Sequence, residues 1–527
     1  MSPSYRNILR SSMGVLSANL LSRILGFFRI IIEANVLGGG VYKAGWVLAF
    51  TIANIFRRIL GEGALAQALI PMLSSTLEKE GVEASRRQLN AIFFWLSALL
   101  ALISIFTALI AMVLKSFVTS EHAVLACTLI PLLSPYILIM CLVGILSSVL
   151  NTFRIFFLPA LGALFLNIFM IGGMLIIPYF GGSGVSLLEN LAYAVLISGL
   201  IEFSLMLWLM KCKKILPKFR WENIRNRSAV TELGKLALPG IIGTSAYQVS
   251  VLVDRFLSSS LGAQAVSALE YSERLVYFPV GVVAVSISGV MLAEMSRSVG
   301  RGDFEGMLAQ LRLGLRHISF MAVPVAAFMI VFRTEILEGL LLHGKFTRSD
   351  LDETAFAMLF YSLGIPFFCS FKIITNAFYS RKDMVTPVII GICAIILNIT
   401  LNLILMRYLR QGGIALATVA ASLFNNFALL LILRRKLKRT LGMWPVNLAL
   451  WRNLLTAFAA GYTVHWMFPF LADGLGAGGI FNSRMVNLAA LLLGLGFCGA
   501  LYLFFSWLLR CSEIPELLSI FSRKLKR

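Results

Sequence analysis

SRILGFFRIIIEANVLGGG, at residues 22–40, is an apolar stretch that carries charged residues. A second stretch of the same kind, NIFRRILGEGALAQALIP, lies at residues 54–71. These two stretches indicate how the chain folds. Both stretches are apolar enough to form membrane-spanning helices, yet both carry arginines. An arginine at the centre of a membrane helix costs roughly 2.5–3.5 kcal/mol even on lenient insertion scales, so we expect these side chains to face a water-filled cavity. The residues concerned are Arg23, Arg29, Arg57 and Arg58, with Glu33 and Glu62 as nearby counter-charges.

The spacing of these arginines suits the binding of an anion. Arg23 and Arg29 are about 120° apart around a helix axis, so both can line one broad face. Arg29 with Glu33, and Arg58 with Glu62, stand at the i,i+4 spacing that allows an ion pair. The forked donors of a guanidinium match phosphate oxygens, so a cluster with too few carboxylates predicts a phosphate site. For any single arginine, snorkelling or a structural ion pair is the alternative.

The composition is that of an integral membrane protein. Of the 527 residues, 59% are hydrophobic and 13% are charged, and the mean hydropathy is +0.87. Apolar runs of about twenty residues recur along the chain, too continuous for an outer-membrane barrel, and predict an all-α protein with about fourteen transmembrane helices. The second span is expected at 44–77, and the eleventh and twelfth are expected at 385–407 and 412–433. The seven cysteines lack CxxC spacing and the four histidines are scattered, so we expect neither a disulfide framework nor a metal site, and no cofactor.

The distribution of charge predicts the topology. The net charge of +21 falls in short loops between spans and not in a basic stripe interleaved with aromatics, so nucleic acid is not an expected partner. If the N-terminus is cytoplasmic, most of these cations lie on the inner side, as the positive-inside rule requires. With an even number of spans, both termini are then cytoplasmic.

An internal repeat predicts two lobes. At a constant offset of 225 residues, Tyr136, Asn151 and Phe153 recur as Tyr361, Asn376 and Phe378. Two six-span lobes of the same orientation follow, with the substrate expected in the cleft between them. The predicted segments are a first lobe at 1–210, a basic cytoplasmic linker at 211–228, a second lobe at 229–440, two extra helices at 441–510 and a basic cytoplasmic tail at 511–527.

Other ionisable residues inside the spans are further candidates. In the eighth span, Arg274 is a candidate fifth cation, although a structural pair with its neighbour Glu273 is the alternative. Lys372 lies in the tenth span. Arg255 lies near a span end, where snorkelling is expected. Glu202 is left open between an ion site and a buried partner.

Several motifs together closely resemble the MurJ/MviN family of bacterial lipid II flippases. They are the two quoted stretches, ERLVYFPVGV at 273–282, HGKFT at 343–347 and FYSRKDMVTP at 378–387. The resemblance covers essentially the whole chain. It implies the fold of the multidrug/oligosaccharidyl-lipid/polysaccharide exporter (MOP) superfamily, with two six-helix lobes in a V and two C-terminal helices that form a groove for the lipid tail. It also implies the bacterial inner membrane and a role in peptidoglycan biosynthesis, cell wall biogenesis and cell shape.

The same resemblance implies the site residues. In the family, arginines of a central cavity hold the substrate pyrophosphate, and the matching positions here are Arg23, Arg29, Arg57 and Arg274. The supporting positions are Arg58, Glu62, Gln67, Glu273 and Lys372. Family members usually carry Asp at the positions of Ile30 and Ala44 and Pro at those of Ala53 and Ala293, so gating steps that rely on those acids are not implied. No acidic residue lies between Met384 and Ala472, so the sodium site that some members build with acids is not implied either.

The expected function is that of a transporter, not an enzyme: it moves lipid II from the inner to the outer leaflet by alternating access. The chain has no Walker motif for direct use of ATP, so the membrane potential or an ion gradient would drive it. Expected partners are lipid II, membrane lipids and other peptidoglycan-synthesis proteins. The alternatives are a related exporter of another polyprenyl-linked oligosaccharide, a multidrug antiporter, a membrane-embedded glycosyltransferase or lipid phosphatase, and a scaffold for cell-wall assembly.

Overall fold

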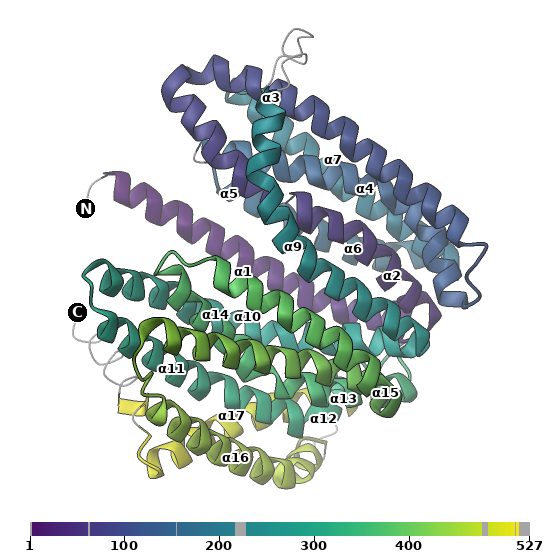
Figure 1. The fold of residues 1–527 in the computed structure, drawn as a ribbon. Coiled ribbons are helices and arrows are strands. Elements are labelled where there is room, and N and C mark those ends of the chain that lie inside the picture. The colour runs from purple at the N-terminus through teal and green to yellow at the C-terminus, as the bar shows by residue number, and fades with distance from the viewer. Residues whose placement is uncertain are drawn as a thin grey trace. The chain divides into compact units, whose positions relative to one another are not determined.

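The computed structural model describes residues 3–61, 64–153, 155–216, 228–476, 483–511 and 513–515, and within these ranges the regular structure is entirely helical (Figure 1). The predicted all-α class is therefore confirmed. The elements are α1 Pro3–Leu37, α2 Val41–Phe56, the π-helix η1 Arg57–Gly61, α3 Ala64–Leu114, α4 Glu121–Thr152, α5 Phe157–Ala160, α6 Gly162–Ile176, the 3₁₀-helix η2 Ile177–Phe180, α7 Gly184–Cys212, α9 Ser228–Ser260, α10 Ala263–Gly300, α11 Phe304–Val331, α12 Arg333–Leu340, α13 Arg348–Leu363, α14 Ile365–Tyr379, α15 Val385–Leu437, α16 Trp444–Gly476 and α17 Ser483–Leu508.

The chain divides into two compact units, Met1–Ser259 and Ser260–Arg527. The first unit holds α1 to α9 and the second holds α10 to α17. The sequence places its lobe boundary earlier, in the 211–228 linker, and the assignment of α9 to the second lobe stays a prediction. Most of that linker (217–227) and most of the 511–527 tail lie outside the described residues.

α3 joins the end of the second span to the whole of the third through a sharp turn. As one straight helix its 51 residues would extend about 77 Å, far more than the roughly 30 Å of a bilayer core. The turn lies at Gly81, whose φ of 82° is readily adopted by glycine. Across it, the Thr76 hydroxyl donates to Gln88 Oε1 at 2.9 Å, so the two segments fold back on each other.

α15 is a second helix hairpin, with 53 residues and its turn at Arg410 (φ 49°, ψ −130°). Asn398 Nδ2 donates to Thr418 Oγ1 at 3.3 Å, although the two residues would be about 30 Å apart in a straight helix. Among the described residues, eleven helices are long and apolar enough to cross a membrane. Because α3 and α15 are hairpins that each join two spans, and α1 adds another, the prediction of about fourteen is met.

Local sequence signals set several helix starts in the second unit. Asp303 Oδ1 accepts from the Gly306 N–H at 2.7 Å at the start of α11. Thr347 and Asp350 cap the start of α13 reciprocally, each side chain binding the other's backbone N–H. Gly364 then separates α13 from α14, which has a proline in its first turn.

Each unit is built around one buried helix. In the first unit, α4 contacts α2, α3 and α7, and Leu129, Leu133 and Tyr136 on it are fully buried. In the second unit, α11 contacts α10, α14 and α16. These central helices position the polar groups described below.

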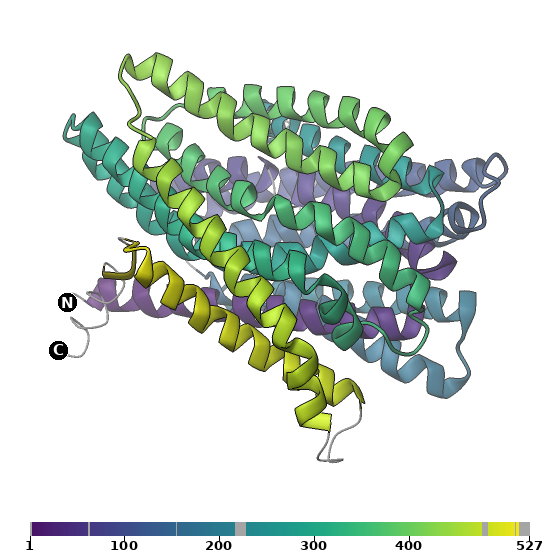
Figure 2. The same cartoon turned by 90° about the horizontal axis from the view of Figure 1, so that it is seen from below.

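The two extra helices, α16 and α17, lie side by side at the edge of the second unit (Figure 2). Polar contacts tie them to α11. The Tyr502 hydroxyl donates to the Phe320 carbonyl oxygen at 2.9 Å, and Arg316 Nε lies 2.9 Å from Glu513 Oε1, just beyond α17.

Candidate functional site

Three buried charges lie together where α1 meets α2. Arg29 Nε lies 3.2 Å from Glu33 Oε1, one turn along α1, so the predicted i,i+4 ion pair is confirmed. Lys43, in the first turn of α2, forms an ion pair with the other carboxylate oxygen of Glu33. The exposed fractions of the Arg29, Glu33 and Lys43 side chains are 6%, 3% and 1%. We call these three residues the charge triad; its formal charge is one net positive.

A tight glycine turn brings Lys43 to α1. α1 ends at Leu37 and α2 begins at Val41, with three glycines between them. Gly38 has a φ of 71°, and its N–H donates to the Ala34 carbonyl oxygen at 3.0 Å, which is the left-handed end common in helices. Sequence reasoning missed Lys43 because it began the second span at residue 44. A lysine in the first turn of an apolar helix was the available signal.

Arg29 also contacts α6. Its NH1 group donates to Met170 Sδ at 3.2 Å, and a thioether is only a weak acceptor. One turn earlier in α6, Asn167 Nδ2 donates to the Ser22 carbonyl oxygen at 3.1 Å. α6 is thereby held against α1 at Ser22 and at Arg29, and the guanidinium is held in place within the first unit.

Arg57 and Arg58 begin the π-helix η1. Such turns are rare inside α-helices and are frequent at functional sites. Arg57 is half-buried and Arg58 is exposed. Arg57 Nε donates to Asn54 Oδ1 at 2.8 Å. The predicted ion pair between Arg58 and Glu62 stays a prediction, because Glu62 lies outside the described residues.

Two glycines allow the π-helix to touch α4. A Cβ on Gly144 would lie 2.2 Å from the Gly61 carbonyl oxygen, so a side chain there cannot be accommodated without a backbone shift. Just before the π-helix, the Cys141 thiol donates to the Phe56 carbonyl oxygen at 3.5 Å. The extra residue of the π-turn is therefore stabilised by α4 packing and by a side-chain donor.

Arg274 lies on α10 in the second unit, and it forms an ion pair with a carboxylate other than the neighbour that the sequence suggested. Its Nε forms an ion pair with Glu270, one turn earlier, and Glu270 is buried. Consecutive helical residues point about 100° apart, so i,i+4 spacing favours Glu270 over Glu273. Glu273 itself is half-buried.

The remaining candidates differ in exposure, and some of them lie outside the described residues. Arg23 on α1 and Lys372 on α14 are both exposed. Glu62 lies outside the described residues, as does the side chain of Gln67. Arg255 is buried in α9 with 7% exposure, so the expectation that it snorkels is wrong.

Glu202 on α7 lies against the start of α6. A Cβ on Gly162, the first residue of α6, would lie 1.9 Å from Glu202 Oε1, so a side chain there would displace this carboxylate. A carboxylate beside a helix N-terminus is stabilised by the helix dipole. Of the two interpretations left open, this contact supports the buried structural partner.

The α15 hairpin buries amides in the acid-free part of the sequence. Asn402 Nδ2 donates to Asn398 Oδ1 at 3.2 Å, and both side chains are buried. With the Asn398 contact to Thr418, these groups supply polar oxygens without any formal negative charge.

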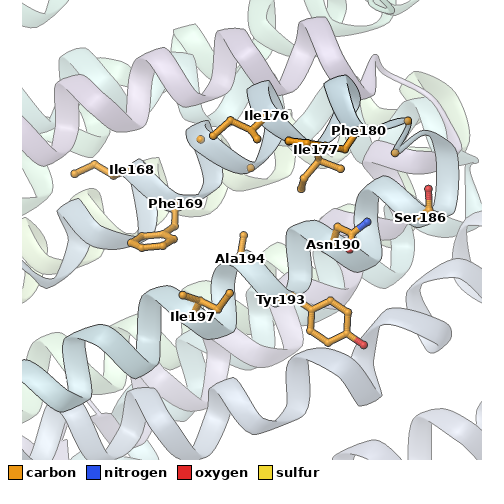
Figure 3. A pocket seen from close by; sticks show the side chains of 14 residues that line it. Ile168, Phe169, Ile176, Ile177, Phe180, Ser186, Asn190, Tyr193, Ala194 and Ile197 are labelled. Carbon is orange, nitrogen blue, oxygen red and sulfur yellow. The ribbon is translucent and has the colours of Figure 1, made fainter.

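A largely apolar groove of about 730 Å³ lies between α6 and α7. Ile168, Phe169 and Ile197 line one end, and Ser186 and Asn190 lie at the other (Figure 3). Its lining carries no ionisable side chain other than a tyrosine, so its surface suits hydrocarbon and not a phosphate group.

The apolar helical spans define the class: an all-helical, multi-pass membrane protein. An inward-facing multidrug resistance MATE family transporter of the MOP superfamily has the same fold, with a TM-score of 0.67 at 12% identity over 81% of this chain and 99% of that one. The chain belongs to the lipid II flippase MurJ family, whose model, "Lipid II flippase MurJ", matches residues 33–481. The resemblance read from the motifs is thus confirmed.

Individual relatives agree with this assignment. A "Probable lipid II flippase MurJ" of Buchnera aphidicola is 30% identical, covering 82% of this chain and 84% of that protein. A protein of the same name from Vibrio cholerae is 30% identical, covering 81% of this chain and 82% of that protein. A "Lipid II flippase MurJ" of Burkholderia cenocepacia is 28% identical, covering 82% of this chain and 84% of that protein. The structure "Lipid II flippase MurJ, inward closed conformation" matches with a TM-score of 0.75 at 25% identity, covering 97% of this chain and 99% of that one.

Proposed function

We propose that this chain moves lipid II, the undecaprenyl-pyrophosphate-linked peptidoglycan precursor, from the inner to the outer leaflet of the bacterial inner membrane. Membership of the MurJ family supports the cargo. The observation that carries the proposal is the charge triad, because it is a buried cluster with a net positive charge, including a guanidinium, inside a membrane protein.

The physical problem of flipping is the pyrophosphate. Its charge cannot cross a low-dielectric core alone, since an isolated ion there costs many kcal/mol. Arginine donors offset this cost with paired, charge-assisted hydrogen bonds to phosphate oxygens. The polyprenyl tail can stay in lipid throughout, so only the head group needs a polar path, which alternating access provides.

Several finer features belong to the same proposal. Both termini lie in the cytoplasm, and the chain acts as a transporter without catalysing a reaction. No cofactor takes part, and the membrane potential or an ion gradient supplies the driving force. Membrane lipids and other peptidoglycan-synthesis proteins are its partners.

The first experiment is native mass spectrometry of the purified full chain with lipid II. Arg29→Ala should weaken binding by about tenfold or more, because it removes a buried charge partner of the anion. The substitution leaves Glu33 paired with Lys43, so no bare carboxylate is created. Arg274→Ala should also weaken binding.

Arg297→Ala is the matched control, since Arg297 is 68% exposed and pairs with Glu294 on the surface of α10. If neither Arg29→Ala nor Arg274→Ala changes the binding of lipid II, the two arginines are structural. A preference for another polyprenyl lipid would assign the chain a different cargo.

A further inference from the structure

We infer that Lys43 is a positioning residue that makes Arg29 available to the substrate's pyrophosphate without touching the substrate. The inference rests on the proposed function and deepens it, because it explains how an arginine already paired with a carboxylate can bind an anion.

The starting observation is that Glu33 is shared. Its Oε1 faces Arg29 Nε at 3.2 Å, while its Oε2 faces Lys43 Nζ. A carboxylate can accept from both sides at once, so each cation neutralises part of it. If Glu33 had Arg29 as its cation but not Lys43, an incoming anion would compete with a full buried ion pair.

Lys43 is the cation that keeps its ion pair with Glu33 when the anion binds. Its side chain is 1% exposed, and the three-glycine turn between α1 and α2 places it next to Glu33 near the end of α1. Withdrawing the buried Lys43 ammonium from Glu33 would leave that ammonium without a counter-charge, which is strongly unfavourable.

Arg29 is the cation that can exchange its partners within the protein for the phosphate group. Its NH1 group donates to the sulfur of Met170, which is only a weak acceptor. A phosphate oxygen is a far better acceptor for the same guanidinium. When the anion binds, Arg29 turns its donors to phosphate, and Lys43 keeps Glu33 neutralised so that the carboxylate does not repel the anion.

This arrangement predicts an unusual double-mutant cycle for lipid II binding. Lys43→Met should weaken binding by about tenfold, because Glu33 then holds Arg29 and repels the anion. Adding Glu33→Gln should restore binding to within about twofold of the wild type, because residue 33 then has no negative charge with which to compete for Arg29. Lys43→Arg should retain binding, and Glu33→Gln alone should bind at least as tightly as the wild type.

The measurement is the dissociation constant of lipid II for the full chain in nanodiscs, with thermal unfolding recorded for every variant. Lys115→Met, at an exposed lysine after α3, is the control. A double variant as weak as Lys43→Met, or Lys43→Met binding like the wild type, would overturn the inference while leaving the proposed function intact. A wild-type chain that does not bind lipid II would overturn both. Because the double variant removes one charge of each sign, its behaviour remains informative even if a single variant folds poorly.

Discussion

Gly144 is the residue of α4 against which the π-helix rests. We predict that Gly144→Ala lowers the free energy of unfolding by about 1–3 kcal/mol, because overpacking against backbone cannot be relieved by a rotamer change. The added Cβ would lie 2.2 Å from the Gly61 carbonyl oxygen. Thermal unfolding of the purified chain in detergent measures the effect.

Gly172→Ala on α6 is the control for this substitution. A Cβ at Gly172 meets no atom within 4 Å, so the variant should be as stable as the wild type or slightly more, through the helix preference of alanine. Equal unfolding temperatures for the two variants would show that α4 and the π-helix can separate at little cost.

At the residue scale, the sequence predicts contacts that lie within one helix and misses those that cross a turn. Arg29 and Glu33 are one turn apart, and their pairing follows from spacing alone. The same rule, applied to Arg274, would have found Glu270. Lys43 reaches Glu33 only because Gly38 adopts a positive φ and reverses the chain, a tertiary event that periodicity does not contain.

Asp383 ties together the two ends of the α15 hairpin. Its Oδ2 lies 2.7 Å from Lys436 Nζ, at the end of α15, and its Oδ1 accepts from the Thr386 N–H at 3.1 Å, at the start. Partial burial alone would raise the pKa of Asp383, but the hydrogen bonds from Lys436 and Thr386 outweigh burial and lower the pKa below 3.8.

Because the pKa of Asp383 is lower in the folded state, its stabilisation should be present above about pH 4 and lost as the pH falls through the folded-state pKa. We predict that Asp383→Asn lowers stability near neutral pH by at most about 1 kcal/mol, since the pair is partly exposed. The difference from the wild type should vanish at acid pH. Unfolding curves across pH test this, with Asp352→Asn, at an exposed residue of α13, as the control; a difference independent of pH would contradict the assignment.

At the element scale, hydrophobic runs predict where helices exist but not how they are interrupted. The span expected at 44–77 does occur, yet it is divided by η1, because one extra residue in a π-turn leaves the apolar pattern almost unchanged. The α15 turn at Arg410, by contrast, lies where the sequence predicts it, between the spans expected at 385–407 and 412–433, although the residue at positive φ is an arginine and not a glycine.

For the whole molecule, we predict that flipping depends on the membrane potential. Each net negative charge carried outward gains about 2.3 kcal/mol per 100 mV when the outside is positive, which is about fifty-fold in the ratio between leaflets. Proteoliposomes with a potassium diffusion potential should therefore flip lipid II faster than vesicles with the potential collapsed. Identical rates would contradict a potential-driven step, and reversing the gradient provides the control.

The fold class and the family were predictable because membrane spans and long motifs are continuous in sequence. The candidate site was predictable only in part. Arg29 and Glu33 were found together as expected, whereas the lobe division and the joint role of Arg274 with the first-unit arginines depend on how separate helices associate, and these stay predictions.

The hydrogen bond from the Cys141 thiol to the Phe56 carbonyl has a practical consequence. Thiol S–H stretching vibrations fall in a window of the infrared spectrum that is nearly empty of other protein bands, and they shift when the hydrogen acquires an acceptor. Cys141 is therefore a native vibrational reporter placed beside Arg57 and Arg58. With a Cys141→Ser chain as the blank, its band can follow, without an added label, whether the π-turn winds or unwinds during each transport cycle.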